Sequence, residues 1–125
     1  MIKSSLVIVA LTAALATPAI AEGDAAKGEK VFKKCKACHA VGDGAKNKVG
    51  PMLNGIVGAT AGQVPDYKYS KAMIEAGEGG LVWDEANLAA YLTKPKDLVE
   101  GTKMSFAGLK KEQDRADVIA YLNGF

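Results

Sequence analysis

The sequence has few of the residues that usually build metal sites, redox-active pairs or base-stacking surfaces. Its 125 residues include one histidine, two cysteines and one tryptophan. A structural zinc site needs four cysteine or histidine ligands, so this count excludes one. The lysines are not interleaved with aromatic residues, and nothing therefore indicates binding to nucleic acid. No alternation of strands and helices surrounds the cysteines, which argues against a thioredoxin-like dithiol.

Long apolar runs are also missing, except at the N-terminus. Residues 6–15 are apolar, and residues 19–21 read Ala-Ile-Ala, which is a small-x-small cleavage pattern. The run is too short to span a membrane comfortably. We therefore expect residues 1–21 to be a cleavable signal peptide for export to the periplasm, with an uncleaved membrane anchor as the alternative. Residues 22–125 then form a single domain.

The most informative motif is short. Cys35, Cys38 and His39 form the pattern Cys-x-x-Cys-His, which is typical of c-type haem attachment. Two thiols three positions apart on a helical turn can each add across a vinyl group of the porphyrin, and the histidine can then bind the iron from one face. A surface pair of cysteines without function is the alternative. The pattern predicts one haem c, attached through Cys35 and Cys38.

The other face of the iron is either open or bound by a residue of another type, because His39 is the only histidine. Met52 and Met73 lie in apolar surroundings in the sequence, and both are interpreted as core residues. Met104 lies 65 residues after His39 in an irregular loop, from which it can reach the opposite face. The spacing favours Met104 as the distal ligand and leaves the other two methionines as alternatives.

A histidine and a methionine on the two faces of the iron would decide the class of function. A thioether is a soft, neutral ligand that favours Fe(II) and so raises the reduction potential. With both axial positions filled, the iron has no place to bind oxygen or peroxide. This ligand pair therefore predicts an electron carrier and not an enzyme.

Apolar periodicity and capping residues predict short helices only. They are expected at residues 25–34, 70–76, 84–92, 96–99 and 111–122. Between the first two lies a loop, residues 41–65, that is rich in glycine. A long ordered loop is uncommon in a compact domain unless it has a special role, and wrapping around a flat cofactor would be such a role. The sequence therefore predicts an all-α domain with short helices and long loops around one haem.

Charge is distributed unevenly along the chain. Residues 27–48 contain seven lysines, and residues 94–111 contain five. The intervening residues 66–93 are acidic. Such asymmetry produces a dipole that can orient encounters with charged partners.

Several motifs in this order resemble the class I c-type cytochromes, and in particular the bacterial cytochrome c2 or c550 type. The resemblance covers all of residues 22–125. It is carried by the haem motif and by residues 49–55, 61–65, 67–70, 91–95, 101–108 and 119–122, together with Trp83.

The resemblance implies the roles of the haem ligands. Cys35 and Cys38 would form the thioether bonds, His39 would be the proximal ligand and Met104 the distal one. The carbonyl of Pro51 would accept a hydrogen bond from the other ring nitrogen of His39.

The resemblance also implies which residues surround the haem. Tyr69 and Trp83 would lie beside a haem propionate, which needs hydrogen-bond donors when buried. Tyr91 and Thr102 would line the side of the haem on which the methionine binds.

The resemblance implies a soluble, monomeric carrier in the periplasm. It would take electrons from a membrane quinol–cytochrome c oxidoreductase and deliver them to a terminal oxidase or a photosynthetic reaction centre. We expect it to dock through a lysine face around the exposed haem edge. This lysine face consists of Lys33, Lys34, Lys36, Lys48, Lys94, Lys96, Lys103 and Lys110.

Two alternatives remain open at this point. A haem enzyme or gas-binding protein would need a labile methionine ligand. A dedicated electron acceptor of a periplasmic dehydrogenase would differ only in its partner, which the sequence does not identify.

Overall fold

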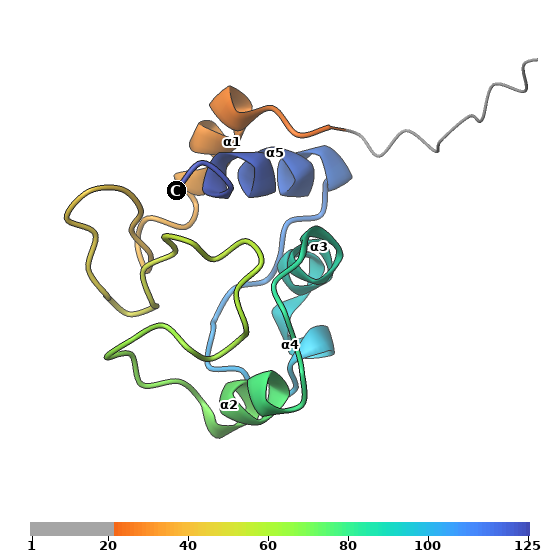
Figure 1. The fold of residues 1–125 in the computed structure, drawn as a ribbon. Coiled ribbons are helices and arrows are strands. Elements are labelled where there is room, and N and C mark those ends of the chain that lie inside the picture. Colours follow the sequence, from red (N-terminus) through yellow and green to blue (C-terminus); the bar gives the residue numbers. More distant parts are fainter. Residues whose placement is uncertain (1–21) are drawn as a thin grey trace, which may run out of the picture.

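The computed structural model describes residues 22–125, and the expected signal peptide at residues 1–21 lies outside them. The described residues form five helices and one isolated antiparallel bridge, between Thr60 and Val82. The helices are α1 (Ala25–Phe32), α2 (Lys71–Glu78), α3 (Glu85–Thr93), α4 (Pro95–Leu98) and α5 (Glu112–Leu122). The long loop between α1 and α2 lies on one side of the molecule, at the left in Figure 1. The prediction of a small all-α domain is confirmed.

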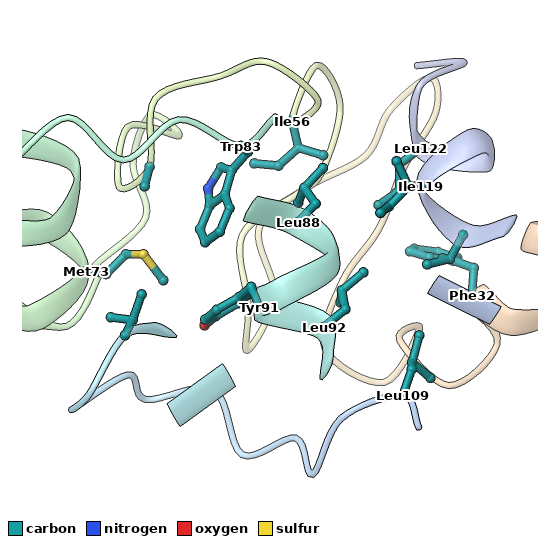
Figure 2. Close-up of a cluster of buried hydrophobic side chains, with 13 residues drawn as sticks. Phe32, Ile56, Met73, Trp83, Leu88, Tyr91, Leu92, Leu109, Ile119 and Leu122 are labelled. Atoms are coloured by element: carbon teal, nitrogen blue, oxygen red, sulfur yellow. The ribbon is translucent and has the colours of Figure 1, made fainter. Parts of the chain in front are cut away.

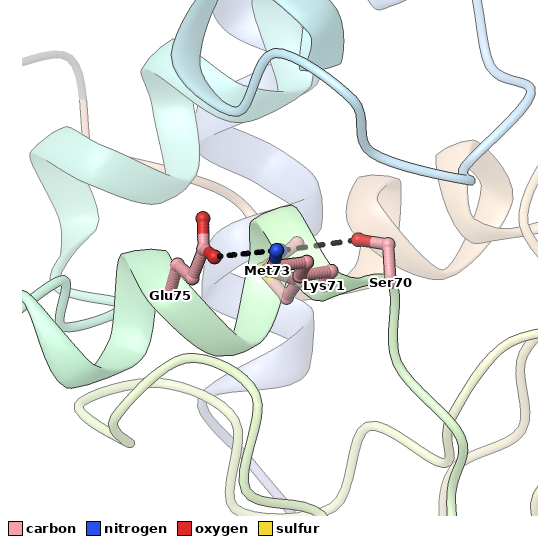
Figure 3. A network of polar contacts seen from close by, with 4 residues as sticks. All are labelled: Ser70, Lys71, Met73 and Glu75. Atoms are coloured by element: carbon pink, nitrogen blue, oxygen red, sulfur yellow. Dashed lines mark hydrogen bonds and ion pairs between the residues drawn. The ribbon is translucent and has the colours of Figure 1, made fainter.

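The helix starts follow from their capping residues. The carboxylate of Asp24 accepts hydrogen bonds from two backbone amides of the first turn of α1. Ser70 caps α2 by accepting from the amide of Met73 at 3.1 Å, and Asp84 caps α3 in the same way. Side-chain oxygens at these positions satisfy amides that have no partner within the helix. Figure 3 shows the cap of α2 beside an exposed ion pair between Lys71 and Glu75.

Two helix ends differ from the prediction. The first helix ends at Phe32 and not at residue 34, and the haem motif continues it as a series of turns. The second helix runs through Gly77, which was expected to end it. A Cβ at Gly77 would lie 2.0 Å from the carbonyl oxygen of Ala61. This glycine therefore allows close packing of α2 against the loop, which is a different role from stopping a helix.

Helices α1 and α5 pack directly against each other (Figure 1). At their crossing, a Cβ on Gly28 would lie 1.9 Å from the carbonyl oxygen of Asp117, so only glycine fits. Next to it the rings of Phe32 and Tyr121 are 5.5 Å apart between centroids. The two helices form a compact end of the molecule that positions the haem motif, which follows α1 directly.

The hydrophobic core lies between α3, α5 and the 41–65 loop (Figure 2). Its buried side chains include the predicted apolar stripe of α3, Leu88, Tyr91 and Leu92. Across residues 22–125, the structure contains no helix that is both long enough and apolar enough to cross a membrane. Several of these core side chains also form walls of a cavity.

Candidate functional site

A cavity of about 390 Å³ lies between the haem motif, α3 and the loops on either side. Its walls are mostly apolar. All of the site residues predicted from the sequence line it: Cys35, Cys38, His39, Pro51, Tyr69, Trp83, Tyr91, Thr102 and Met104. The fold therefore brings into one place side chains that are up to 69 positions apart in the sequence.

His39 is held in a defined orientation at this cavity. Its Nδ1 lies 2.7 Å from the carbonyl oxygen of Pro51. Burial lowers the pKa of His39, and the nearby Lys48 ammonium lowers it further, although the bond to Pro51 acts in the opposite direction. The ring is therefore neutral, and since a carbonyl only accepts, Nδ1 carries the proton. The lone pair is then on Nε2, which is the form of imidazole that binds metals.

Gly50 fixes the loop that carries Pro51 against this ring. Its amide donates to the carbonyl of Cys38 at 2.8 Å. A Cβ at Gly50 would lie 2.4 Å from Cε1 of His39. Any larger residue would therefore push the imidazole or the loop away. The motif around Gly50 was recognised in the sequence, but this contact was not predicted.

The two cysteines of the motif lie on a tight turn and are not joined in a disulfide. The amide of Cys38 donates to the carbonyl of Cys35 at 3.1 Å, and both residues are half-buried at the cavity wall. Burial raises the pKa of the Cys35 thiol, and the neighbouring Cys38 raises it further, while Lys34 acts to lower it. In the described part of the chain, no group of three or more histidine, cysteine, aspartate or glutamate side chains is placed to hold a metal ion.

On another side of the cavity, hydrogen bonds hold the loop that carries Met104. The hydroxyl groups of Tyr91 and Thr102 are 2.7 Å apart. The Thr102 oxygen also accepts from the amide of Met104 at 3.3 Å. Because Tyr91 lies on α3 and is buried, this chain of bonds ties the methionine loop to the core.

The other two methionine candidates differ from each other. Met73, on α2, is buried and also lines the cavity. Met52 is half-buried and belongs neither to the cavity wall nor to the hydrophobic core. The interpretation as a core residue is confirmed for Met73 and is wrong for Met52. The carbonyl of Pro51 holds this part of the loop by its bond to His39, which leaves the next side chain outside the core.

Tyr69 and Trp83 also line the cavity. The Trp83 ring is buried, and its centroid lies 4.9 Å from that of Tyr91 (Figure 2). The Tyr69 hydroxyl accepts from the amide of Val64 at 3.0 Å, which leaves its proton free to donate. Burial raises the pKa of Tyr69, so the hydroxyl stays protonated.

A volume of this size with apolar walls and few polar groups is typical of a cofactor site. A family model described as Cytochrome c matches residues 25–125 of the chain. The chain belongs to the cytochrome c family.

Similar proteins agree with this assignment. This cytochrome is 57% identical over 101 residues to a cytochrome c2 of Agrobacterium tumefaciens, a match that covers 81% of this chain and 91% of the relative. It is 58% identical over 104 residues to a cytochrome c2 of Rhodomicrobium vannielii, covering 83% and 81%. Among solved structures, cytochrome c2 from Rhodospirillum centenum superposes with a TM-score of 0.79 at 46% identity, covering 82% of this chain and 98% of that one.

A cytochrome c carries covalently attached haem c, and the residues present fit this group. The two thiols have the spacing of the attachment motif and face the same cavity as His39. Because Nδ1 is bonded to Pro51, Nε2 of His39 would be the atom that offers a nitrogen ligand to the iron. The missing side chain at Gly50 leaves the ring the room to hold this position. The cytochrome c2 relatives support a role in electron transport.

Proposed function

We propose that this cytochrome is a periplasmic one-electron carrier in which His39 and Met104 bind the haem iron from opposite faces. One observation carries the proposal. An oriented neutral imidazole and a thioether from a distant loop line the same apolar cavity. When bound, the haem supplies an iron that changes between two oxidation states, at a potential that a histidine–methionine pair raises.

The chain's own residues would keep this exchange free of side reactions. Pro51 holds His39 in one orientation and increases its basicity through the bond to Nδ1. Tyr91 and Thr102 hold the loop of Met104 in place. The apolar walls exclude water from the ligands. We further propose that Cys35 and Cys38 form the thioether bonds.

The surroundings of the propionates belong to the same proposal. Tyr69 has a hydroxyl proton that is free to donate, and Trp83 has an indole N–H. Both residues line the cavity. We propose that they donate hydrogen bonds to a haem propionate.

The partners and the location follow from the charge pattern and from the expected signal peptide. All members of the lysine face are exposed, and Lys34 and Lys103 also line the cavity. We propose that residues 1–21 direct export and are removed, and that residues 22–125 act as a monomer. The carrier would take electrons from a quinol–cytochrome c oxidoreductase and pass them to an oxidase or a reaction centre through this face.

The methionine ligand can be tested with a matched pair of variants. We expect the oxidised holoprotein to show the weak sulfur-to-iron absorption band. Met104→Leu should abolish this band and lower the reduction potential, because the thioether that favours Fe(II) is lost. Met73→Leu should retain the band, since Met73 lines the same cavity but is not the proposed ligand. Loss of the band in the Met73 variant alone would reverse the assignment.

A second measurement tests the electron carrier against a gas-binding protein. If both axial positions are filled, the reduced holoprotein should not bind carbon monoxide at neutral pH. Rapid binding would contradict the proposal.

A further inference from the structure

Tyr67 has no role in the proposal above, although it contacts both sides of the cavity. Its hydroxyl donates to the carbonyl oxygen of Val49 at 2.8 Å, across 18 positions of sequence. Val49 directly precedes Gly50 and Pro51, which hold the His39 ring. The tyrosine is therefore anchored to the loop on the histidine side.

The ring of Tyr67 contacts the loop on the methionine side. The ammonium of Lys103 lies 4.5 Å from the ring centroid, at a distance suited to a cation–π contact. The same ammonium donates a hydrogen bond to the carbonyl of Lys68, the next residue along from Tyr67. Lys103 directly precedes Met104. One tyrosine thus contacts both the loop that holds the His39 ring and the loop that carries Met104.

The methionine loop has few other connections at this point. Within residues 22–125, no hydrogen bond between backbone groups involves residues 103–108. Thr102 and Leu109, on either side, are tied to Val99 and Leu92. Segments with few hydrogen bonds open locally at a low free-energy cost. The contacts of Lys103 with Tyr67 and Lys68 therefore add to the bonds of Thr102 in holding Met104 in place.

We propose that Tyr67 is a positioning residue that joins the histidine-side loop to the methionine loop and so limits the departure of the Met104 thioether from the iron. This inference rests on the proposed function. For Met104 to leave, Lys103 must move away from a ring that the bond to Val49 holds still. Without the hydroxyl, the ring can follow Lys103, and the methionine loop opens more readily.

The test uses the oxidised holoprotein and imidazole, a small ligand that takes the place of the thioether. Tyr67→Phe keeps the ring and removes only the hydroxyl. We expect it to raise the affinity for imidazole about two- to tenfold, which corresponds to the loss of one ordinary hydrogen bond. Tyr121→Phe is the matched control, because Tyr121 packs between Phe32 and Phe125 at the α1–α5 end. It should leave the affinity unchanged.

A second variant tests whether Tyr67 acts through Lys103. Lys103→Leu removes the ammonium without adding a second thioether beside Met104, and it should also raise the affinity for imidazole. In the double variant the two increases should not multiply, because both changes interrupt one connection. Full multiplication would show that the residues act separately and would overturn the inference.

The remaining outcomes separate a positioning role from a general one. If Tyr67→Phe lowers the unfolding temperature but leaves the affinity within the range of the control, the residue only stabilises the fold and the inference is wrong. A wild-type band that depends on Met104 would then leave the proposed function standing. If the band does not depend on Met104, both proposals fall.

Discussion

Asp117 is a buried carboxylate that ties the last helix to the start of the domain. Its Oδ1 accepts from the amide of Asp24 at 2.8 Å and from Nε2 of Gln113 at 2.7 Å. The bond from Asp24 and then the bond from Gln113 hold the pKa of Asp117 below the ordinary range of a carboxyl group, while burial acts to raise it and Lys27 acts to lower it. The carboxylate therefore stabilises the fold in its ionised form.

The pH dependence of stability should show this effect. A folded-state pKa below the unfolded value stabilises the protein fully above the unfolded value, which is about 3.9. The contribution is lost as the pH falls towards the folded-state pKa. We expect Asp117→Asn to lower the free energy of unfolding in urea at neutral pH and to flatten its decline in acid. The exposed Asp43→Asn should match the wild type, and parallel curves for all three proteins would contradict this role.

The site residues differ in how far the sequence could predict them. Cys35, Cys38 and His39 form a motif whose spacing reflects its chemistry, and the structure places them on one cavity. Tyr67 could not be predicted to contact both loops. Its partners are a backbone carbonyl, which carries no sequence signal, and a lysine on a loop far along the chain.

Among the helices, the starts were easier to predict than the ends. Asp24, Ser70 and Asp84 each cap a helix as expected, because capping is a local interaction. The ends depend on packing between distant segments. Gly77 lies within α2 and packs closely against the carbonyl of Ala61, and no local signal shows that contact.

The crossing of α1 and α5 should tolerate little change at Gly28. An added methyl group would meet the backbone of Asp117, so Gly28→Ala must push the helices apart. We expect the free energy of unfolding to fall by about 1–3 kcal/mol, as for other overpacked sites. Denaturant titration would measure it. Glu29→Ala, at an exposed position of the same helix, should change stability by less than about 0.5 kcal/mol.

At the scale of the whole molecule, the proposed docking depends on the uneven charge distribution. The lysine face is exposed, while several acidic residues lie on and around α2. Opposite charges on a partner would steer it towards the cavity and raise the association rate.

The dependence of this rate on salt can be measured by stopped-flow reaction with an acidic redox partner. The rate should fall steeply as the ionic strength rises from about 0.01 M to about 0.15 M, which shortens the Debye length from about 30 Å to about 8 Å. Lys36→Gln should lower the rate at low salt and reduce the salt dependence. Lys71→Gln removes the same charge from α2, outside the lysine face, and should have little effect. Equal effects of the two variants would exclude a localised docking face.

The contact between α1 and α5 also constrains the order of events during the protein's maturation. The haem motif follows α1 directly, whereas the helix that packs against α1 is α5, the last of the five described helices. A polypeptide emerging from its N-terminus therefore presents both thiols while α1 still has nothing to pack against. Only when α5 has been made can it pack on α1 and complete the end of the domain beside the haem motif.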